Sequence, residues 1–417
     1  MAAAISVSSL FAQLERPTLP LPKLRQLLAD VRGIFIANGF IGWLFAATAP
    51  VAIILSVGAQ GSLSESQLAS WIFGVFCING AITLLFSWLF RQPLAFFWTI
   101  PGTVLVGPAL AHLSFAEVIG AYYVTGIVMV ALGASGLVRR AMKAVPMPIV
   151  MGMVAGVFLR FGLDLVRALK ADIAIAAPMV VTWVVLSSVP KLGRRVPPII
   201  GALIVGVAAS LMLGRIDSGA VGAFALASPV FQAPVFSIRA LVELVIPLAI
   251  TVLVVQNGQG FAVLKTADHE APIDAVTVAC GVGTLLSATV GGVCSCLAGP
   301  TNAILVSSGE RNRQYIAGMV TGALSIVFGI LSPPFTRFML HAPKALIMVL
   351  AGLAMLRVLQ DAFSAAFKQR FTLGALVSFL VTVADISLFD VGAAFWGLIA
   401  GVLISLLLEK HDFVAAP

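Results

Sequence analysis

Long apolar stretches separated by short polar connections follow one another from Arg32 almost to the end of the chain. Most have about 20 residues, the length that a helix needs to cross roughly 30 Å of hydrocarbon. Strands of a membrane barrel would instead show shorter segments of alternating polarity, and this pattern does not occur. Because backbone groups in lipid must find partners within their own segment, the pattern predicts an all-α polytopic membrane protein.

The apolar pattern divides into fourteen segments. They cover residues 33–57, 67–90, 96–113, 116–138, 145–166, 173–190, 197–213, 239–264, 272–293, 296–309, 314–332, 342–360, 371–387 and 391–408. The third and the tenth are too short or too interrupted to be ordinary spanning helices. Residues 1–32 and 410–417 are predicted to be cytoplasmic tails, and residues 214–238 an external connection.

Composition and charge agree with a membrane location. Hydrophobic residues make up 60% of the 417 and charged residues 10%, a balance that no soluble core can accommodate. The N-terminal tail has no continuous apolar region followed by a cleavage site, so it is not a secretory signal. With both termini inside, most of the 25 Lys and Arg residues lie on the cytoplasmic side. The sequence therefore predicts a multi-pass protein of a bacterial-type inner membrane, with the lipid bilayer and not nucleic acid as its partner.

A comparison of the chain with itself indicates an internal repeat. At an offset of 197 residues, four positions of the fifth segment match the twelfth: Pro146, Met151, Arg160 and Asp164 with Pro343, Met348, Arg357 and Asp361. The chain is thus predicted to hold two seven-segment units, residues 33–213 and 239–409. Because seven is odd, the second unit is inverted, which is the usual scaffold of alternating-access carriers.

The third and tenth segments contain matching helix breaks. Pro101-Gly102-Thr103 follows an extended aromatic run, Phe96-Phe97-Trp98, and Pro300-Thr301-Asn302 follows Cys294-Ser295-Cys296. Proline is tolerated at the first helical position, so a half-helix is predicted to begin at each break near mid-membrane. Unpaired N–H groups at such a start can hold an anion without a buried cation. The alternative is that both breaks are ordinary kinks of membrane helices.

Carboxamides interrupt the eighth segment at Gln256-Asn257-Gly258-Gln259-Gly260. Gln256 and Gln259 are one helical turn apart and are predicted to point together into a cavity, where they can donate to a carboxylate. The alternative is a hydrogen-bond clamp between helices. Thr48-Ala49-Pro50 places another polar, helix-breaking triplet near the middle of the first segment, and a simple proline kink is its alternative reading.

Ionisable groups give weaker signals. Arg160 and Arg357 are predicted to pair with the aspartates four residues further on, or else to belong to a gate. Glu117, Glu243 and Glu310 lie near predicted helix ends, where a capping or interfacial role is expected; the alternative is a proton carrier, for which Glu243 is the candidate beside the substrate itself. Histidines are scattered and the four cysteines lie in or beside apolar segments, so neither a metal site nor a cofactor is predicted. No nucleotide motif or converging catalytic triad occurs, so the chain is not expected to be an enzyme.

Three of these motifs carry a resemblance to a known family. Thr48-Ala-Pro, then Trp98-Thr-Ile-Pro-Gly-Thr, then Gln256-Asn followed by Gly260-Phe-Ala-Val-Leu, resemble the benzoate:proton symporter family from about Arg32 to Glu409. That family is similar in architecture to the nucleobase–ascorbate and sulfate-permease carriers. The resemblance implies a core domain of segments one to four and eight to eleven, moving against a gate domain of segments five to seven and twelve to fourteen. The chain departs from the family's pattern at Gly258-Gln259-Gly260 and at Cys294-Ser-Cys.

The sequence thus predicts a secondary transporter of a small organic anion, benzoate or a related aromatic carboxylate, by alternating access. Proton symport is what the resemblance implies, and a homodimer is left open beside a monomer. The predicted substrate-binding residues are Thr48, Pro101, Gly102, Thr103, Gln256, Asn257, Gln259, Pro300, Thr301 and Asn302, with Phe96, Phe97 and Trp98 as an apolar wall. A nucleobase or inorganic-anion carrier of the same fold, or an anion channel, remains the alternative function.

Overall fold

The structure is a computed structural model that describes residues 14–144, 146–189, 193, 196–215, 225–307, 309–386, 388 and 392–414. Within this part of the chain, seven helices are long and apolar enough to cross a membrane, and several shorter apolar helices accompany them. Each of the fourteen predicted segments contains a helix. The hydrophobic pattern therefore located the helices correctly.

The helices and strands of the first half follow the predicted order. They are α2 (Leu24–Asp30), α3 (Gly33–Ala47), α4 (Ala49–Gln60), α5 (Glu65–Phe73), η2 (Gly74–Ile78), α6 (Asn79–Phe90), β1 (Phe96–Trp98), α7 (Ile100–Ala109), α8 (Phe115–Ala134), α9 (Val138–Ala144), α10 (Met147–Ala171), α11 (Ile173–Ser188) and α13 (Pro198–Met212). The first segment is broken at Thr48, between α3 and α4. Helices α2 and α9 were not predicted: α2 lies in the N-terminal tail and α9 in the connection after the fourth segment. Both are short and contain no long apolar run by which the pattern could have located them.

The second half begins with a long helix that changes its pitch several times. Its elements are α14 (Ile238–Ala240), η4 (Leu241–Val245), α15 (Ile246–Ile250), η5 (Thr251–Asn257), α16 (Gly258–Thr266), α17 (Ile273–Ala288), β2 (Ser295–Leu297), α18 (Gly299–Leu305), η6 (Arg311–Arg313), α19 (Tyr315–Ile330), α20 (Ser332–Leu340), α21 (Lys344–Ala366), α22 (Thr372–Ala384), α23 (Ala393–Leu408) and α24 (Lys410–Val414). Both η4 and η5 are wide π-helical turns, which are frequent at functional sites.

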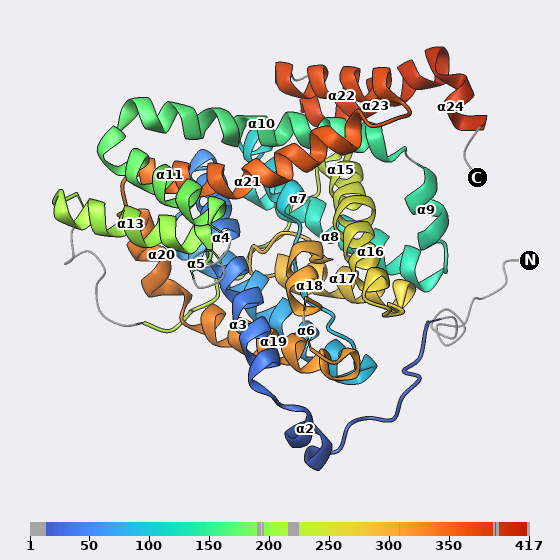
Figure 1. Ribbon diagram of the computed structural model, residues 1–417. Coiled ribbons are helices and arrows are strands. Elements are labelled where there is room, and N and C mark those ends of the chain that lie inside the picture. Colours follow the sequence, from blue (N-terminus) through green and yellow to red (C-terminus); the bar gives the residue numbers. More distant parts are fainter. Residues whose placement is uncertain are drawn as a thin grey trace, which may run out of the picture.

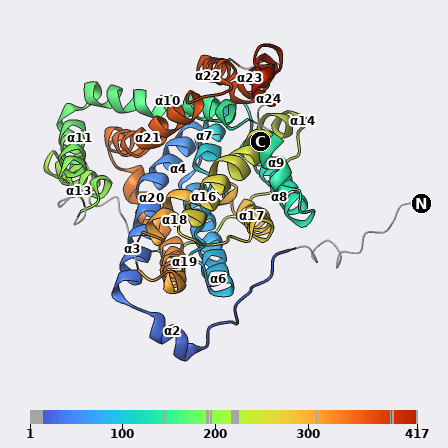
Figure 2. The same ribbon diagram turned by 45° about the vertical axis from the view of Figure 1, so that its right-hand side comes forward.

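The helices form two groups (Figure 1). The second helix group consists of α10, α11, α13 and α21–α23; within it α10 packs along α21, α11 along α13, and α22 along α23. The first helix group contains α3–α8 and α14–α19, with α8 against α17 and α6 against α19. Both Figure 1 and Figure 2 show the green and red helices of the second group gathered beside the remaining helices.

Strands β1 and β2 meet inside the first helix group. They are antiparallel, with Phe97 opposite Cys296, and each leads directly into a half-helix, α7 or α18. Two further backbone bonds extend the ladder, from Thr99 N–H to the Cys294 carbonyl and from Ala298 N–H to the Ala95 carbonyl, both 2.9 Å. Extended backbone is tolerated at membrane depth only where its polar groups are paired inside the protein, and this crossover pairs them. The predicted breaks of the third and tenth segments are confirmed, and they lie side by side.

Charged pairs differ from those predicted. Arg160 pairs with Asp385, beyond α22, and Asp164 pairs with Arg167 at 2.9 Å. Arg357 reaches Gln360 at 3.4 Å. The predicted pairs at a spacing of four residues are therefore wrong on both helices, because long arginine side chains reach other partners on neighbouring turns or elements. Glu117 does cap α8, in a reciprocal capping box with Ser114.

Close packing in the second helix group gives a first testable expectation. A Cβ added at Gly374 of α22 would lie 1.9 Å from the Ser405 hydroxyl and 2.6 Å from the Gly401 carbonyl of α23. We expect Gly374→Ala to force the two helices apart and to cost about 1–3 kcal/mol of stability. Thermal unfolding followed by intrinsic fluorescence in detergent should show a lower Tm. Gly33→Ala is the matched control because its Cβ would meet nothing within 4 Å; equal melting of the two variants would contradict the packing argument.

Candidate functional site

A small pocket lies where the broken segments meet. Its volume is about 20 Å³, enough for about one water molecule. Residues from four predicted segments line it: Phe45, Ala46, Pro50, Phe97, Trp98, Ile100, Gln256, Ala298, Pro300 and Thr301. The pocket thus adjoins the starts of both half-helices, α7 and α18, and the break between α3 and α4.

Two side chains give the pocket its polar character. Gln256 is 6% exposed and Thr301 is 2% exposed. Neither side chain makes a hydrogen bond with another described residue, so the amide and the hydroxyl can both form hydrogen bonds with a ligand. Helix α18, where Thr301 lies, starts without a side-chain cap. Its first N–H groups therefore add donors at the same place.

Aromatic rings form one side of the pocket. Phe97 and Trp98 line it, and both contact Phe76, with ring centroids 5.9 and 5.1 Å away. Phe96 packs on Phe86, with ring centroids 5.2 Å apart, and is not among the residues that line the pocket. Of the three residues predicted to form the wall, Phe97 and Trp98 line the pocket and Phe96 does not, because its ring packs against α6.

The predicted residues at the other breaks shape the backbone. The Thr48 hydroxyl donates to the Leu44 carbonyl at 2.9 Å, while Ala46 and Pro50, two positions before and after it, line the pocket. At the start of α7, the Gly102 N–H donates to the Thr99 hydroxyl at 3.1 Å, and the Thr103 hydroxyl donates to the Thr99 carbonyl at 2.8 Å. Pro101 occupies the first turn of this helix and is buried, as a helix start with proline requires.

Two predicted amides hold the strands in place. The Asn257 Oδ1 accepts from the Leu297 N–H of β2 at 2.7 Å. The Asn302 Oδ1 accepts from the Ala95 N–H at 3.0 Å, and its Nδ2 donates to the Ala95 and Ala298 carbonyls at 3.3 and 2.8 Å. Both side chains are fully buried and lie outside the pocket lining. For these two residues the structure agrees with a clamp.

Gln259 does not join Gln256 in the pocket. Its side chain is exposed and lies against Gly299, where an added Cβ would come within 2.6 Å of the glutamine Cγ. The prediction of a shared face assumed a regular α-helix, whereas Gln256 belongs to the wide turn η5 and Gln259 to the α-helix after it. The three-residue spacing therefore places the two amides on different sides.

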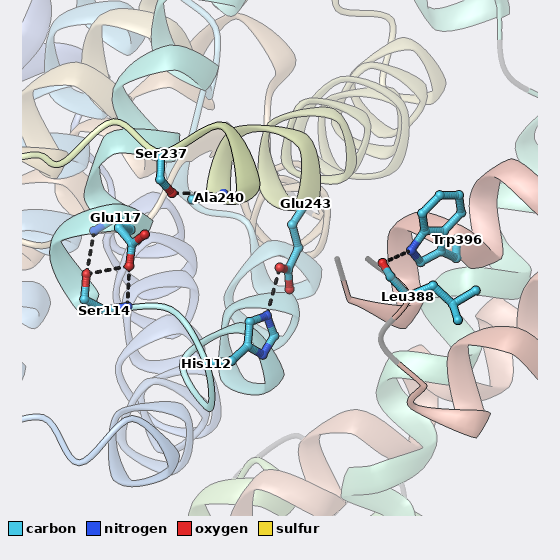
Figure 3. A network of polar contacts seen from close by, with 8 residues as sticks. All are labelled: His112, Ser114, Glu117, Ser237, Ala240, Glu243, Leu388 and Trp396. Carbon is cyan, nitrogen blue, oxygen red and sulfur yellow. Dashed lines mark hydrogen bonds and ion pairs between the residues drawn. The ribbon is translucent and has the colours of Figure 1, made fainter. Parts of the chain in front are cut away.

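A second, larger cavity of about 300 Å³ lies between the two helix groups. Helix α7 lines both spaces, with Ile100 at the small pocket and Val104, Leu105 and Pro108 at the large cavity. Residues Gly156–Phe161 of α10 and Gly392–Phe395 at the start of α23 face it from the second group, and include Arg160. Glu243 faces it from the first group, where its carboxylate lies 2.9 Å from the His112 imidazole (Figure 3).

Sequence reasoning did not anticipate the pairing of Glu243 with His112. They are 131 positions apart, and no local spacing connects them. Glu243 was expected to be interfacial or capping, yet it is 5% exposed within η4. One indication of this pairing was present in the sequence: Glu243 lies inside an apolar segment, six residues after Ser237, and a carboxylate buried there needs a partner.

Solved structures identify the fold. The chain is similar to the transmembrane domain of a cyanobacterial bicarbonate transporter, BicA, with a TM-score of 0.58 and 17% identity over 89% of this chain and 98% of that one. It is also similar to SLC26A9, with a TM-score of 0.64 and 14% identity over 93% of this chain and 67% of that one. Murine Slc26a9, an anion transporter in the inward-facing state, is similar with a TM-score of 0.63 and 15% identity over 98% of this chain and 73% of that one. The chain is thus an all-α polytopic membrane protein with the fold of these anion transporters.

The match to a family model places the chain in a class of membrane transport proteins. The chain belongs to the benzoate membrane transport protein family, whose model matches residues 29–407. Escherichia coli K12 has a relative described as inner membrane protein YdcO, 28% identical over 384 residues, covering 90% of this chain and 97% of the relative. A benzoate membrane transport protein of Acinetobacter baylyi is 28% identical over 380 residues, which cover 89% of this chain and 94% of the relative. The resemblance seen in the motifs is confirmed, and the family is one of transporters, not enzymes.

Proposed function

We propose that this protein is a secondary active transporter of benzoate or a related aromatic carboxylate, that it works by alternating access with proton symport, and that the small pocket is its substrate site. The observation that carries the proposal is the pocket itself, which combines two unpaired polar side chains with two aromatic rings. The relative from Acinetobacter baylyi is described as a benzoate transport protein, and the Escherichia coli relative as an inner membrane protein. An inner-membrane location with cytoplasmic termini belongs to the same proposal.

The chemistry of the pocket suits an aromatic carboxylate. The Gln256 amide and the Thr301 hydroxyl can donate to the carboxylate, and the uncapped start of α18 adds backbone N–H groups. The faces of Phe97 and Trp98 offer contact to the ring. Among the described residues that line the small pocket there is no Lys or Arg, so neutral dipoles would hold the anion and let it leave again.

The arrangement of the helices supports an inverted repeat with a moving boundary. When each of the first seven segments is matched to its counterpart in the last seven, α6 corresponds to α17 and α8 to α19. The contact of α8 with α17 is then equivalent to the contact of α19 with α6, and β1 is equivalent to its partner β2. On this basis residues 33–213 and 239–409 are the two repeats, the first helix group is the core domain and the second is the gate domain. The large cavity between them is the route by which the anion reaches the pocket.

The pocket has to widen for transport. A ring the size of benzene occupies a cavity of about 150 Å³, and the pocket offers about 20 Å³. Movement of the second helix group away from α4 and α7 would supply this space, since α10 packs on α7 and α21 on α4. Rocking of one group against the other is the usual way in which inverted-repeat carriers expose a central site.

Uptake into proteoliposomes tests the proposed function. We expect labelled benzoate to accumulate when the outside is acidified, and we expect unlabelled aromatic carboxylates to compete with it more strongly than acetate does. Because a carboxylic acid can cross lipid in its neutral form, protein-free liposomes are the control for leak. Competition by nucleobases or by bicarbonate, without competition by aromatic acids, would favour the alternative carrier. Currents far above carrier turnover would favour a channel.

A further inference from the structure

Glu243 is a buried carboxylate at the boundary between the two helix groups. It lies in η4, 5% exposed, and its Oε2 is 2.9 Å from the Nε2 of His112, in the turn after α7. Figure 3 shows the two side chains pointing toward each other, with Trp396 of α23 to the right of the pair. A carboxylate taken this far from water needs a partner that compensates its charge, and the imidazole is within hydrogen-bond distance.

The other oxygen of Glu243 faces the second helix group. A Cβ added at Gly392 would lie 2.6 Å from the Oε1, and the Gly392 backbone interacts favourably with the carboxylate. Gly392 is the N-cap of α23, a helix of 16 residues whose N-terminal end carries partial positive charge. Trp396 of the same helix donates to the Leu388 carbonyl at 3.0 Å and so links Leu388 to α23. The contact therefore joins a charged group of the first helix group to a helix start of the second.

Further charged groups face this place from the surrounding elements. Arg239, one turn before Glu243, attracts both it and Glu117 of α8. Arg160, Asp385 and Arg167 line the same cavity from the second helix group; Arg160 is paired with Asp385, and Arg167 with Asp164. Among the described residues, His112 is the titratable side chain that lies within hydrogen-bond distance of Glu243. Glu243 and His112 therefore form a hydrogen-bonded pair of titratable side chains at this site.

We propose that Glu243 and His112 form the binding site of the co-transported proton, and that the charge of Glu243 controls the contact with α23. This inference rests on the proposed function. When Glu243 is ionised, its carboxylate attracts the positive start of α23 and holds the two helix groups together. A proton taken up from solvent through the large cavity binds a carboxylate oxygen, and the attraction to α23 falls. The second helix group is then free to move, and the pair releases the proton on the other side.

Glu243→Gln tests the assignment by separating coupling from passage. For one proton per anion, an inward gradient of one pH unit drives about tenfold accumulation, since one pH unit corresponds to a factor of ten in free proton concentration. We expect the variant to lose this accumulation, so that internal and external benzoate become equal. Exchange of internal unlabelled for external labelled benzoate, which needs no net proton movement, should continue at a comparable rate. Its rate should no longer depend on pH, whereas the wild-type rate should.

Glu117→Gln is the matched control. Glu117 is a carboxylate of the neighbouring helix α8, and glutamine preserves its capping box with Ser114. We expect this variant to accumulate benzoate as the wild type does. If Glu243→Gln does not fold, as judged by thermal unfolding, His112→Gln replaces it and should likewise flatten the pH dependence of exchange.

Two results would overturn the assignment. The first is pH-driven accumulation of benzoate at the wild-type level in the folded variants. The second is loss of both exchange and accumulation, which would place Glu243 in the path of the substrate. A failure of the proposed substrate looks different, because the wild type would then show no benzoate exchange at all. The two proposals can therefore fail independently of each other.

Discussion

Replacing Gln256 with leucine is expected to reduce benzoate uptake about tenfold to a hundredfold, because a hydrogen bond to a charged group is worth about 1.5–3 kcal/mol. The amide is 6% exposed and lines the small pocket opposite Pro300 and Thr301. Leucine has a similar volume and fits an apolar segment, so the fold should persist. Initial rates of uptake into proteoliposomes, normalised to the amount of folded protein, measure the effect.

Gln259→Leu is the matched control for this prediction. It makes the same chemical change three positions further along, at an exposed side chain outside the pocket. We expect uptake within about twofold of the wild type, as for most surface substitutions. Equal losses in the two variants would show that the amides of this segment act through helix packing, and the small pocket would lose its claim to be the substrate site.

Replacing Asn302 with alanine is expected to produce the largest loss of stability. Its amide makes three buried hydrogen bonds: two tie α18 to the N–H and the carbonyl of Ala95, the residue before β1, and the third goes to the Ala298 carbonyl at the start of α18. Removal leaves the buried Ala95 N–H without a partner, whereas both carbonyls keep a backbone donor; one unpaired donor and two further lost bonds together cost about 3 kcal/mol or more. Thermal unfolding in detergent should show a clear fall in Tm, and transport should fall with the amount of folded protein.

Asn312→Ala provides the comparison. Asn312 lies in the exposed turn η6, ten positions after Asn302. Its side chain makes no hydrogen bond within the part of the chain that the structure describes. Its replacement should leave the Tm nearly unchanged. If Asn302→Ala melted at the same temperature as Asn312→Ala, the strand crossover would not depend on this clamp.

The sites of these variants show where sequence reasoning succeeded and where it stopped. Proline and glycine at residues 101–102 and 299–300 mark helix starts because their backbone chemistry is local, and the structure confirms both. The roles of the carboxamides depended on their orientation, and that was not local. Of the three in the eighth segment, one lines the pocket, one clamps β2 and one is exposed. The wide turn η5 decides this division, and no residue pattern announced it.

The arginines illustrate the same limit. The spacing of Arg160 and Asp164 allows a pair on one helix, and helical geometry alone favours it. In the structure Arg160 instead pairs with Asp385, which the packing of α10 on α22 brings close. Long flexible side chains choose their partners among everything within reach, so sequence spacing is a poor guide once helices are packed together.

By itself the sequence determined that this protein is a polytopic helical membrane protein, where its apolar segments lie, and which family it belongs to. Those properties follow from the length of apolar runs and from short motifs, both of which act locally. Tertiary structure decided that β1 and β2 pair, that the small pocket forms beside their half-helices, and that Glu243 meets His112. These contacts join residues more than a hundred positions apart, and hydrogen bonding and packing select them only when the whole bundle has formed.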